Sequence, residues 1–187
     1  MSSSVNAKLP LHIGVIVFDG VVQQDFVGVT SYLEQLPSVC DQPVKFSTIS
    51  LTSGPLRSRN SLGFGMPLYA THGFEDVTEH IDILVIPGGS PGRLAMQQHE
   101  AFMKFLKRVA GDATYVLTAH PTVNWVHKAR WVRDGYIWTS SGVTAGMDMA
   151  HAFMTAVYGE GVAVTMARYM ENVPNTDAND DPFATVG

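Results

Sequence analysis

The sequence predicts a single α/β domain built on a doubly wound, mostly parallel β-sheet with helices on both faces. Four apolar segments rich in β-branched residues have the pattern of strands buried on both faces: residues 11–18, 44–51, 81–87 and 114–119. Segments with helical spacing of apolar residues alternate with them, which indicates βαβ units. The 187 residues suffice for one domain with a core and are too few for two.

The first half of the chain contains a helix and a short edge strand beside two of these strands. Apolar residues recur at helical spacing over residues 21–36, and Pro37 is expected to end this helix. Gly54-Pro55 indicates a loop. Residues 66–70 are expected to form the short edge strand.

Three further helices are expected in the second half. Residues 99–110 carry a helical apolar stripe, and Gly111 is expected to act as the C-terminal stop. Residues 144–158 and 161–170 carry similar stripes. At the start of the helix over residues 144–158, the hydroxyl groups of Ser140, Ser141 and Thr144 are interpreted as helix caps. The alternative is that some of them line the pocket.

The alternation of strands and helices breaks after Ala119. Residues 123–131 resemble a strand more than a helix, and residues 133–135 have the composition of a hairpin turn. The tryptophans of this region, Trp125, Trp131 and Trp138, are expected to pack against the sheet or against a second copy of the chain. Such a hairpin would expose more aromatic surface than a small monomer tolerates, so we predict a homodimer.

Composition and charge exclude several functional classes. The formal net charge is −5 and no Lys/Arg stripe is present, which argues against nucleic-acid or membrane partners. Apolar runs are too short to span a bilayer. The only cysteine, Cys40, indicates a reducing, cytoplasmic location. The seven histidines form no metal-ligand pattern, so neither a metal nor a cofactor is expected.

The ends of the chain are assigned separately from the domain. Residues 1–10 are Ser-rich and polar, without the apolar stretch of a secretory signal, and are expected to be a disordered lead. Residues 11–171 form the predicted domain. Residues 172–187, rich in Pro, Asn and Asp, are expected to be a frayed tail.

Three blocks of sequence resemble one protein family in their order along the chain. Residues 14–33 (GVIVFDGVVQQDFVGVTSYL) resemble its opening strand and helix start. Residues 82–92 (DILVIPGGSPG) resemble its strand and Pro-Gly-Gly turn, and residues 129–150 resemble its hairpin and its Ser-Gly-Val-x-Ala-Gly-x-Asp helix entry. The family is the ThiJ/PfpI superfamily, in its isonitrile hydratase branch. The resemblance implies the class I glutamine amidotransferase-like fold, a flavodoxin-like sandwich.

The resemblance also shows what this chain lacks. In the family, a strand like residues 114–119 runs into a sharp turn that holds a nucleophilic cysteine at a helix N-terminus, where its thiol pKa falls. Here Ala119 is followed directly by His120-Pro121, which resembles the segment just before the family's hairpin. The sequence is therefore interpreted as internally truncated between Ala119 and His120, without the elbow cysteine.

The resemblance selects the candidate site residues. Asp25 is the candidate general acid or base, although a helix N-terminal aspartate can also be purely structural. Gly88 and Gly89 are expected to supply an oxyanion hole and to bind substrate, or alternatively to form a plain turn. Thr118, at the end of the strand over residues 114–119, is a candidate for binding substrate, and His120 after it is a candidate catalytic base or nucleophile. Cys40 is expected in a loop at the opposite edge of the sheet, away from the cleft.

Two classes of function stay open, beside a third explanation. The resemblance implies a hydratase of the lyase class that adds water to an isocyanide, its small-molecule partner, to give an N-substituted formamide. Alternatively the protein is a pseudoenzyme or binding protein that keeps the cleft without the nucleophile. The sequence is also consistent with an incomplete gene model, since the gap falls cleanly between two matching segments.

Overall fold

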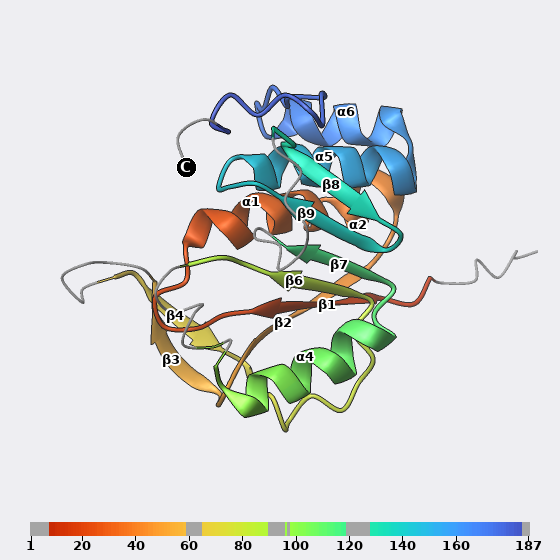
Figure 1. The fold of residues 1–187 in the computed structure, drawn as a ribbon. Coiled ribbons are helices and arrows are strands. Elements are labelled where there is room, and N and C mark those ends of the chain that lie inside the picture. Colours follow the sequence, from red (N-terminus) through yellow and green to blue (C-terminus); the bar gives the residue numbers. More distant parts are fainter. Residues whose placement is uncertain (1–7, 59–64, 90–95, 97, 119–127, 185–187) are drawn as a thin grey trace, which may run out of the picture.

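The computed structural model describes residues 8–58, 65–89, 96, 98–118 and 128–184 (Figure 1). These residues form a seven-stranded sheet, a separate two-stranded sheet and helices on both faces of the larger sheet. The predicted α/β fold class is confirmed. None of the helices in this part of the chain is both long and apolar enough to cross a membrane.

The seven-stranded sheet is parallel except at one edge. Its strands are β1 (Leu11–Ile16), β2 (Val44–Ser50), β5 (His72–Gly73), β6 (Ile83–Ile86), β7 (Tyr115–Thr118), β8 (Trp131–Asp134) and β9 (Ile137–Ser140). Their order is β5-β2-β1-β6-β7-β9-β8, and only the β8/β9 hairpin is antiparallel. The four segments predicted to be parallel strands all lie in this sheet.

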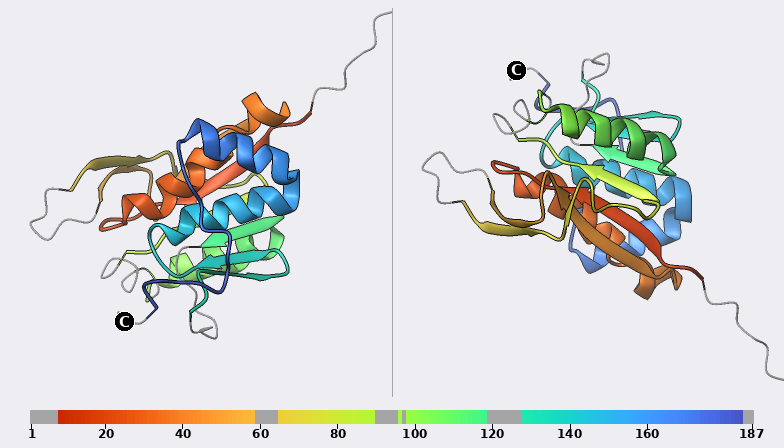
Figure 2. Two further views of the ribbon diagram at one scale, coloured as in Figure 1. Left: turned by 90° about the horizontal axis from the view of Figure 1, so that it is seen from above. Right: turned by 90° about the horizontal axis from the view of Figure 1, so that it is seen from below.

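Helices cover the sheet unequally. They are α1 (Gln23–Leu33), α2 (Leu36–Cys40), α4 (Glu100–Asp112), α5 (Ala145–Tyr158) and α6 (Glu160–Tyr169). Helix α4 lies on one face, whereas α1 and α5 lie on the other and α6 packs outside α5 (Figures 1 and 2). A parallel sheet requires this two-sided cover, because its strands are apolar on both faces.

Three local predictions are wrong because the effect of proline or glycine on a helix or strand depends on its position within that element. Pro37 does not end a helix; it stands in the first turn of α2, where its missing N–H costs nothing. Gly54-Pro55 begins strand β3 (Gly54–Arg57), which pairs only with β4 (Pro67–Ala70), so Pro55 interrupts no central ladder. Gly111 lies within α4, which continues to Asp112.

The tryptophans of the hairpin belong to the core. Trp131 and Trp138 are 8% and 3% exposed, and the Trp138 ring packs edge-on against Phe153 of α5 at 5.6 Å between centroids. The predicted packing of these two tryptophans against the sheet is confirmed, and the exposed aromatic surface expected of the hairpin is absent at both positions, since the sheet and α5 enclose them. Trp125 lies outside the described residues.

Helices α1 and α5 pack closely against each other where each of them carries a glycine. A Cβ placed on Gly28 of α1 would lie 2.6 Å from Cγ of Met147. A Cβ on Gly146 of α5 would meet Val29 and the backbone oxygen of Asp25 at 3.7 and 3.9 Å. This contact fixes the start of α1 above the sheet.

The C-terminal segment is ordered by buried charges. Arg130 is buried and donates from Nε to Asp148 of α5 at 2.8 Å and from Nη1 to Asp181 at 3.3 Å. The Arg130 N–H donates to the oxygen of Ala178, and the Asn175 N–H to Asp148 Oδ1. The expectation of a frayed tail is therefore wrong for residues 172–184, which Figure 2 shows running across α5.

Replacing Phe153 tests the core. Phe153 is fully buried and contacts both Tyr115 and Trp138 edge-on. We expect Phe153→Ala to lower the free energy of unfolding by about 3–5 kcal/mol, from lost burial and the cavity left behind. Chemical denaturation measures this, with Tyr169→Ala, at an 80% exposed position of α6, as the control that leaves stability within about 0.5 kcal/mol. Equal effects of the two changes would contradict this packing.

Replacing Arg130 tests the charge cluster. Arg130→Met leaves Asp148 and Asp181 buried without their cation, and we expect a loss of about 3–5 kcal/mol in the free energy of unfolding. Limited proteolysis should then cut residues 172–184 faster. Arg168→Met, at an exposed position of α6, is the matched control and should change neither measurement. An unchanged cleavage rate for Arg130→Met would show that other contacts hold the tail.

Candidate functional site

A buried carboxylate and a backbone amide meet at the carboxyl ends of the strands. Asp25 stands in the first turn of α1 and is 5% exposed. Its Oδ2 accepts a hydrogen bond from the N–H of Gly88 at 2.9 Å. Because Gly88 lies two residues beyond β6, the Asp25 carboxylate lies at the edge of the sheet where open α/β folds bind ligands.

The turn after β6 is shaped by glycine. The oxygen of Gly88 accepts a hydrogen bond from the Val22 N–H at 3.3 Å, so this turn holds the start of α1 from two sides. Gly89 has φ +136°, and a Cβ there would lie 2.7 Å from the backbone oxygen of Gly20. Only glycine fits this position, because both the backbone conformation and the space exclude a side chain.

Two neighbouring strands end at the same edge. Thr118, the last residue of β7, is in register with Ile86 of β6 and Thr139 of β9. Ser140 follows Thr139, and its Oγ is buried without a hydrogen-bond partner among the described residues. The Cβ position on Gly146 lies 3.8 Å from this Oγ and 3.9 Å from the backbone oxygen of Asp25. Ser140 therefore lies near the start of α1.

The serine and threonine residues before α5 do not act as predicted. Thr144 occupies the N-cap position but makes no side-chain capping bond. Its hydroxyl instead accepts a hydrogen bond from Arg130 Nη2 at 2.9 Å, and Ser141 bonds to Asp181. The interpretation as helix caps is wrong because the Arg130 cluster recruits these side chains. Ser140 was not among the site residues predicted from the sequence. Its place at the end of a buried strand is the signal that could have assigned it to this edge of the sheet.

The surroundings of Asp25 favour its protonated form. Burial raises the pKa of the Asp25 carboxyl, and the hydrogen bond from Gly88 only partly opposes this effect. Oδ1 is buried and has no partner among the described residues. With Oδ2 accepting from Gly88, a proton on this carboxyl belongs on Oδ1. Asp25 can thus store and deliver a proton, which is what general acid–base catalysis requires.

The glycine turn differs from a simple oxyanion hole. The Gly88 N–H is already donated to Asp25, so in this arrangement it is not available to a substrate oxygen. No hydrogen bond between described residues uses the N–H of Gly89. Gly88 thus positions Asp25, and the role of Gly89 as a backbone donor to substrate stays a prediction. His120 lies outside the described residues.

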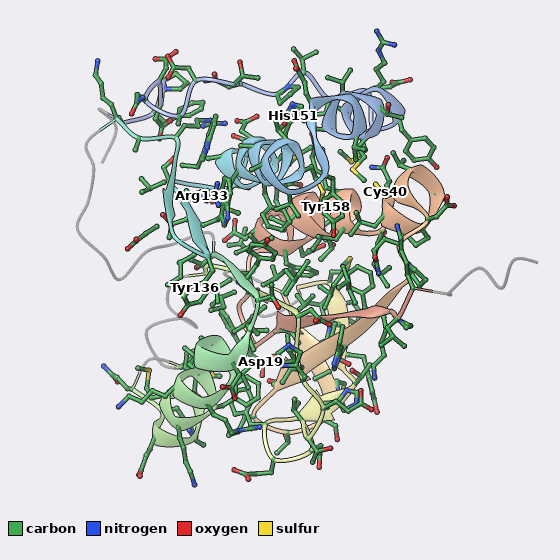
Figure 3. The ribbon with its side chains drawn as sticks, turned by 90° about the vertical axis from the view of Figure 1, so that its right-hand side faces the viewer. Asp19, Cys40, Arg133, Tyr136, His151 and Tyr158 are labelled. Atoms are coloured by element: carbon green, nitrogen blue, oxygen red, sulfur yellow. The ribbon has the colours of Figure 1, made fainter. Side chains whose placement is uncertain are left out.

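The only thiol lies elsewhere. Cys40 is the last residue of α2, not part of a loop as predicted, and its backbone oxygen accepts a hydrogen bond from Lys8, just before β1 (Figure 3). That position is at the amino ends of the strands, opposite Gly88. Burial raises the pKa of the Cys40 thiol, which disfavours the reactive thiolate. Within the described ranges, no three His, Cys, Asp or Glu side chains gather as possible metal ligands.

This arrangement defines the protein as an open α/β sandwich with a polar site beyond the carboxyl ends of its parallel strands. Residues 12–120 match the model of the DJ-1/PfpI family. The chain belongs to that family.

The chain is also similar to individual proteins, in sequence or in fold. The chain is 26% identical to the isonitrile hydratase of Pseudomonas putida over 194 residues, covering 89% of this chain and 80% of that protein. Its structure resembles a ThiJ/PfpI family protein from Pseudomonas syringae, with a TM-score of 0.75, 20% identity and coverage of 92% and 79% of the two chains. It also resembles Drosophila melanogaster DJ-1beta, with a TM-score of 0.72, 15% identity and coverage of 88% and 100%.

The turn that carries the site can be tested through glycine. We expect Gly89→Ala to lower the free energy of unfolding by about 1–3 kcal/mol, because the added methyl group meets the backbone at Gly20 and Val21. Gly111→Ala is the control: that glycine lies in α4 with open space around it, so alanine should be neutral or stabilising. Thermal unfolding of both variants measures this difference in stability. Equal melting temperatures would contradict the close approach of this turn to α1.

Proposed function

We propose that this protein is an isonitrile hydratase-like member of the family, in which Asp25 is the acid–base group for adding water to an isocyanide. The observation that carries the proposal is the buried Asp25 carboxyl, with a raised pKa and one oxygen without a partner among the described residues. The similarity to the Pseudomonas putida isonitrile hydratase supports the choice of substrate.

The chemistry needs one proton donor and one water. Protonated Asp25 gives its proton to the terminal carbon of the isocyanide, which forms a nitrilium ion. Water adds to that carbon while the Asp25 carboxylate takes up a proton from it, giving an imidic acid. Movement of the hydroxyl proton to nitrogen yields the N-substituted formamide. The sum is one isocyanide plus one water giving one formamide, with Asp25 returned to its protonated form.

We expect this reaction to be slow. The resemblance implies that related enzymes use a thiolate, and here the only cysteine lies at the opposite edge of the sheet. Losing a covalent nucleophile normally costs orders of magnitude in rate. The alignment to the hydratase spans 194 residues, more than the 187 of this chain, so this chain lacks residues that the relative has. This supports the interpretation of a missing elbow segment.

Cys40 and Asp25 lie at opposite edges of the sheet, and this separation also favours a second candidate function. A protein that keeps the cleft and loses the nucleophile would act as a pseudoenzyme that binds a small molecule without converting it. An incomplete gene model would explain the same gap, and a transcript covering residues 115–131 distinguishes the two. A cytoplasmic location and a homodimer stay predictions; light scattering over a wide concentration range tests the dimer.

Activity is tested by following formamide production from a simple isocyanide such as cyclohexyl isocyanide. We compare this chain, its Cys40→Ala variant, and a form in which a cysteine-containing elbow and helix are restored between Ala119 and His120. Slow turnover that survives Cys40→Ala, with a large gain on restoring the elbow, supports the proposal. Loss of turnover in Cys40→Ala would overturn the placement of Cys40, and no turnover in the first two proteins would favour the pseudoenzyme.

Asp25 is tested by combining activity with stability. Because its folded pKa is raised, turnover should be highest at low pH and fall as pH rises through that pKa. Asp25→Asn should reduce turnover by about 100-fold. At neutral pH it should leave the free energy of unfolding unchanged or higher, because it removes a buried charge and keeps an acceptor for Gly88. A clear loss of stability would instead indicate a structural aspartate that stabilises the start of α1.

A further inference from the structure

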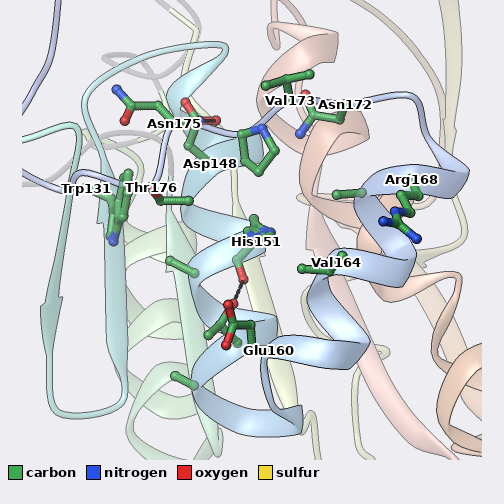
Figure 4. A pocket seen from close by; sticks show the side chains of 15 residues that line it. Trp131, Asp148, His151, Glu160, Val164, Arg168, Asn172, Val173, Asn175 and Thr176 are labelled. Atoms are coloured by element: carbon green, nitrogen blue, oxygen red, sulfur yellow. Dashed lines mark hydrogen bonds between the residues drawn. The ribbon is translucent and has the colours of Figure 1, made fainter.

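A pocket lies beside α5, away from the candidate site at the carboxyl ends of the strands. It has a volume of about 640 Å³ and lies between α5, α6 and the C-terminal segment (Figure 4). Its apolar wall consists of small and branched side chains together with one indole ring: Trp131, Ala152, Ala156, Val164, Ala167 and Pro174. The volume falls in the range of pockets that hold small organic molecules.

One buried polar side chain of this pocket has a ring nitrogen without a hydrogen-bond partner among the described residues. His151 of α5 is 7% exposed, and its ring meets that of Tyr32 edge-on at 6.2 Å between centroids. Among the residues that the structure describes, none makes a hydrogen bond to its buried Nδ1 or to the rest of the ring. Figure 4 shows His151 between α5 and α6, facing Val164 on the other wall.

The other polar groups of the wall are either hydrogen-bonded within the protein or exposed, as Thr176 is. Asp148 uses one oxygen for Arg130 and the other for the Asn175 N–H. Asn172 donates to the hydroxyl of Tyr32 at 3.0 Å. Glu160 and Arg168, of opposite charge, lie at exposed positions of α6. His151 is therefore the buried group whose hydrogen-bonding capacity the described structure leaves open to a ligand.

The state of the imidazole selects the ligand. Burial lowers the pKa of His151 despite the charge of Asp148, so the ring is neutral at neutral pH. A neutral ring carries one hydrogen. Buried N–H groups without partners are rarer than buried acceptors without partners, so the hydrogen belongs on Nε2 and the sealed Nδ1 keeps the lone pair. The edge that the ring can offer to the pocket is then a donor.

We propose that this pocket binds a small neutral carbonyl compound, a ketone or amide with an apolar body. Its oxygen accepts a hydrogen bond from His151 Nε2, and its apolar part covers the alanines of α5 and Val164. The inference does not depend on the reaction at Asp25, since this site uses none of the residues at the carboxyl edge of the sheet.

Acetophenone and ethylbenzene, which share one shape and differ in the carbonyl oxygen, serve as probes. Two-dimensional NMR of the full chain should show acetophenone shifting the amide signals of Ala152, Ala156 and Val164. Ethylbenzene should bind about fivefold more weakly, the effect of one neutral hydrogen bond. In His151→Phe, which keeps a ring against Tyr32, the two probes should bind equally. Equal binding of both probes to the unmodified chain would overturn the proposal.

A second pair of variants separates the pocket from the remaining surface. Val164 lines the pocket, whereas Thr165 points elsewhere on the same exposed turn of α6. Val164→Glu should abolish acetophenone binding and Thr165→Glu should leave it unchanged. The ring-nitrogen signals of His151 should show the Nε2–H form. A hydrogen on Nδ1, or signals of these residues that change with protein concentration because a second copy covers the face, would overturn the assignment.

Discussion

A parallel sheet has two apolar faces, and its stability requires that both be covered. In this protein α4 covers one face, while α1 and α5 share the other. Sharing one face forces the two helices together, and Gly28 and Gly146 permit the close approach. The start of α1 is then fixed against the turn after β6 by the hydrogen bonds of Gly88. The position of Asp25 follows from this packing.

The same packing places a titratable group where ionisation is unfavourable. A carboxyl in the first turn of a helix is normally favoured as an anion by the helix dipole. Here burial outweighs that effect, so the pKa of Asp25 is raised. An arrangement that costs stability at neutral pH is typical of a functional position. Asp25 and Ser140 each have a buried oxygen without a hydrogen-bond partner in the described part of the chain, and both lie near the same helix start, which gives the site a polar interior.

The outer layer of the protein depends on a second interaction. Arg130, just before β8, bonds to Asp148 of α5 and to Asp181 of the C-terminal segment, so one cation connects the hairpin, a helix and the tail. These groups are buried, and each carboxylate needs the guanidinium as its partner. The fixed tail forms one wall of the pocket around His151. Without this cluster the pocket would lose that wall.

The parallel sheet, its alternating helices and the glycine turn after β6 are predictable from the sequence. Continuous apolar runs, helical spacing and Pro-Gly-Gly are local patterns, and local patterns are readable without the fold. The sequence also indicated Asp25 as a candidate general acid or base. Three further features depend on the three-dimensional fold: Gly88 donates to Asp25, the sheet and α5 enclose Trp131 and Trp138, and Arg130 holds the tail. These contacts join residues far apart in the chain, and their existence depends on burial and close packing, which no local pattern records.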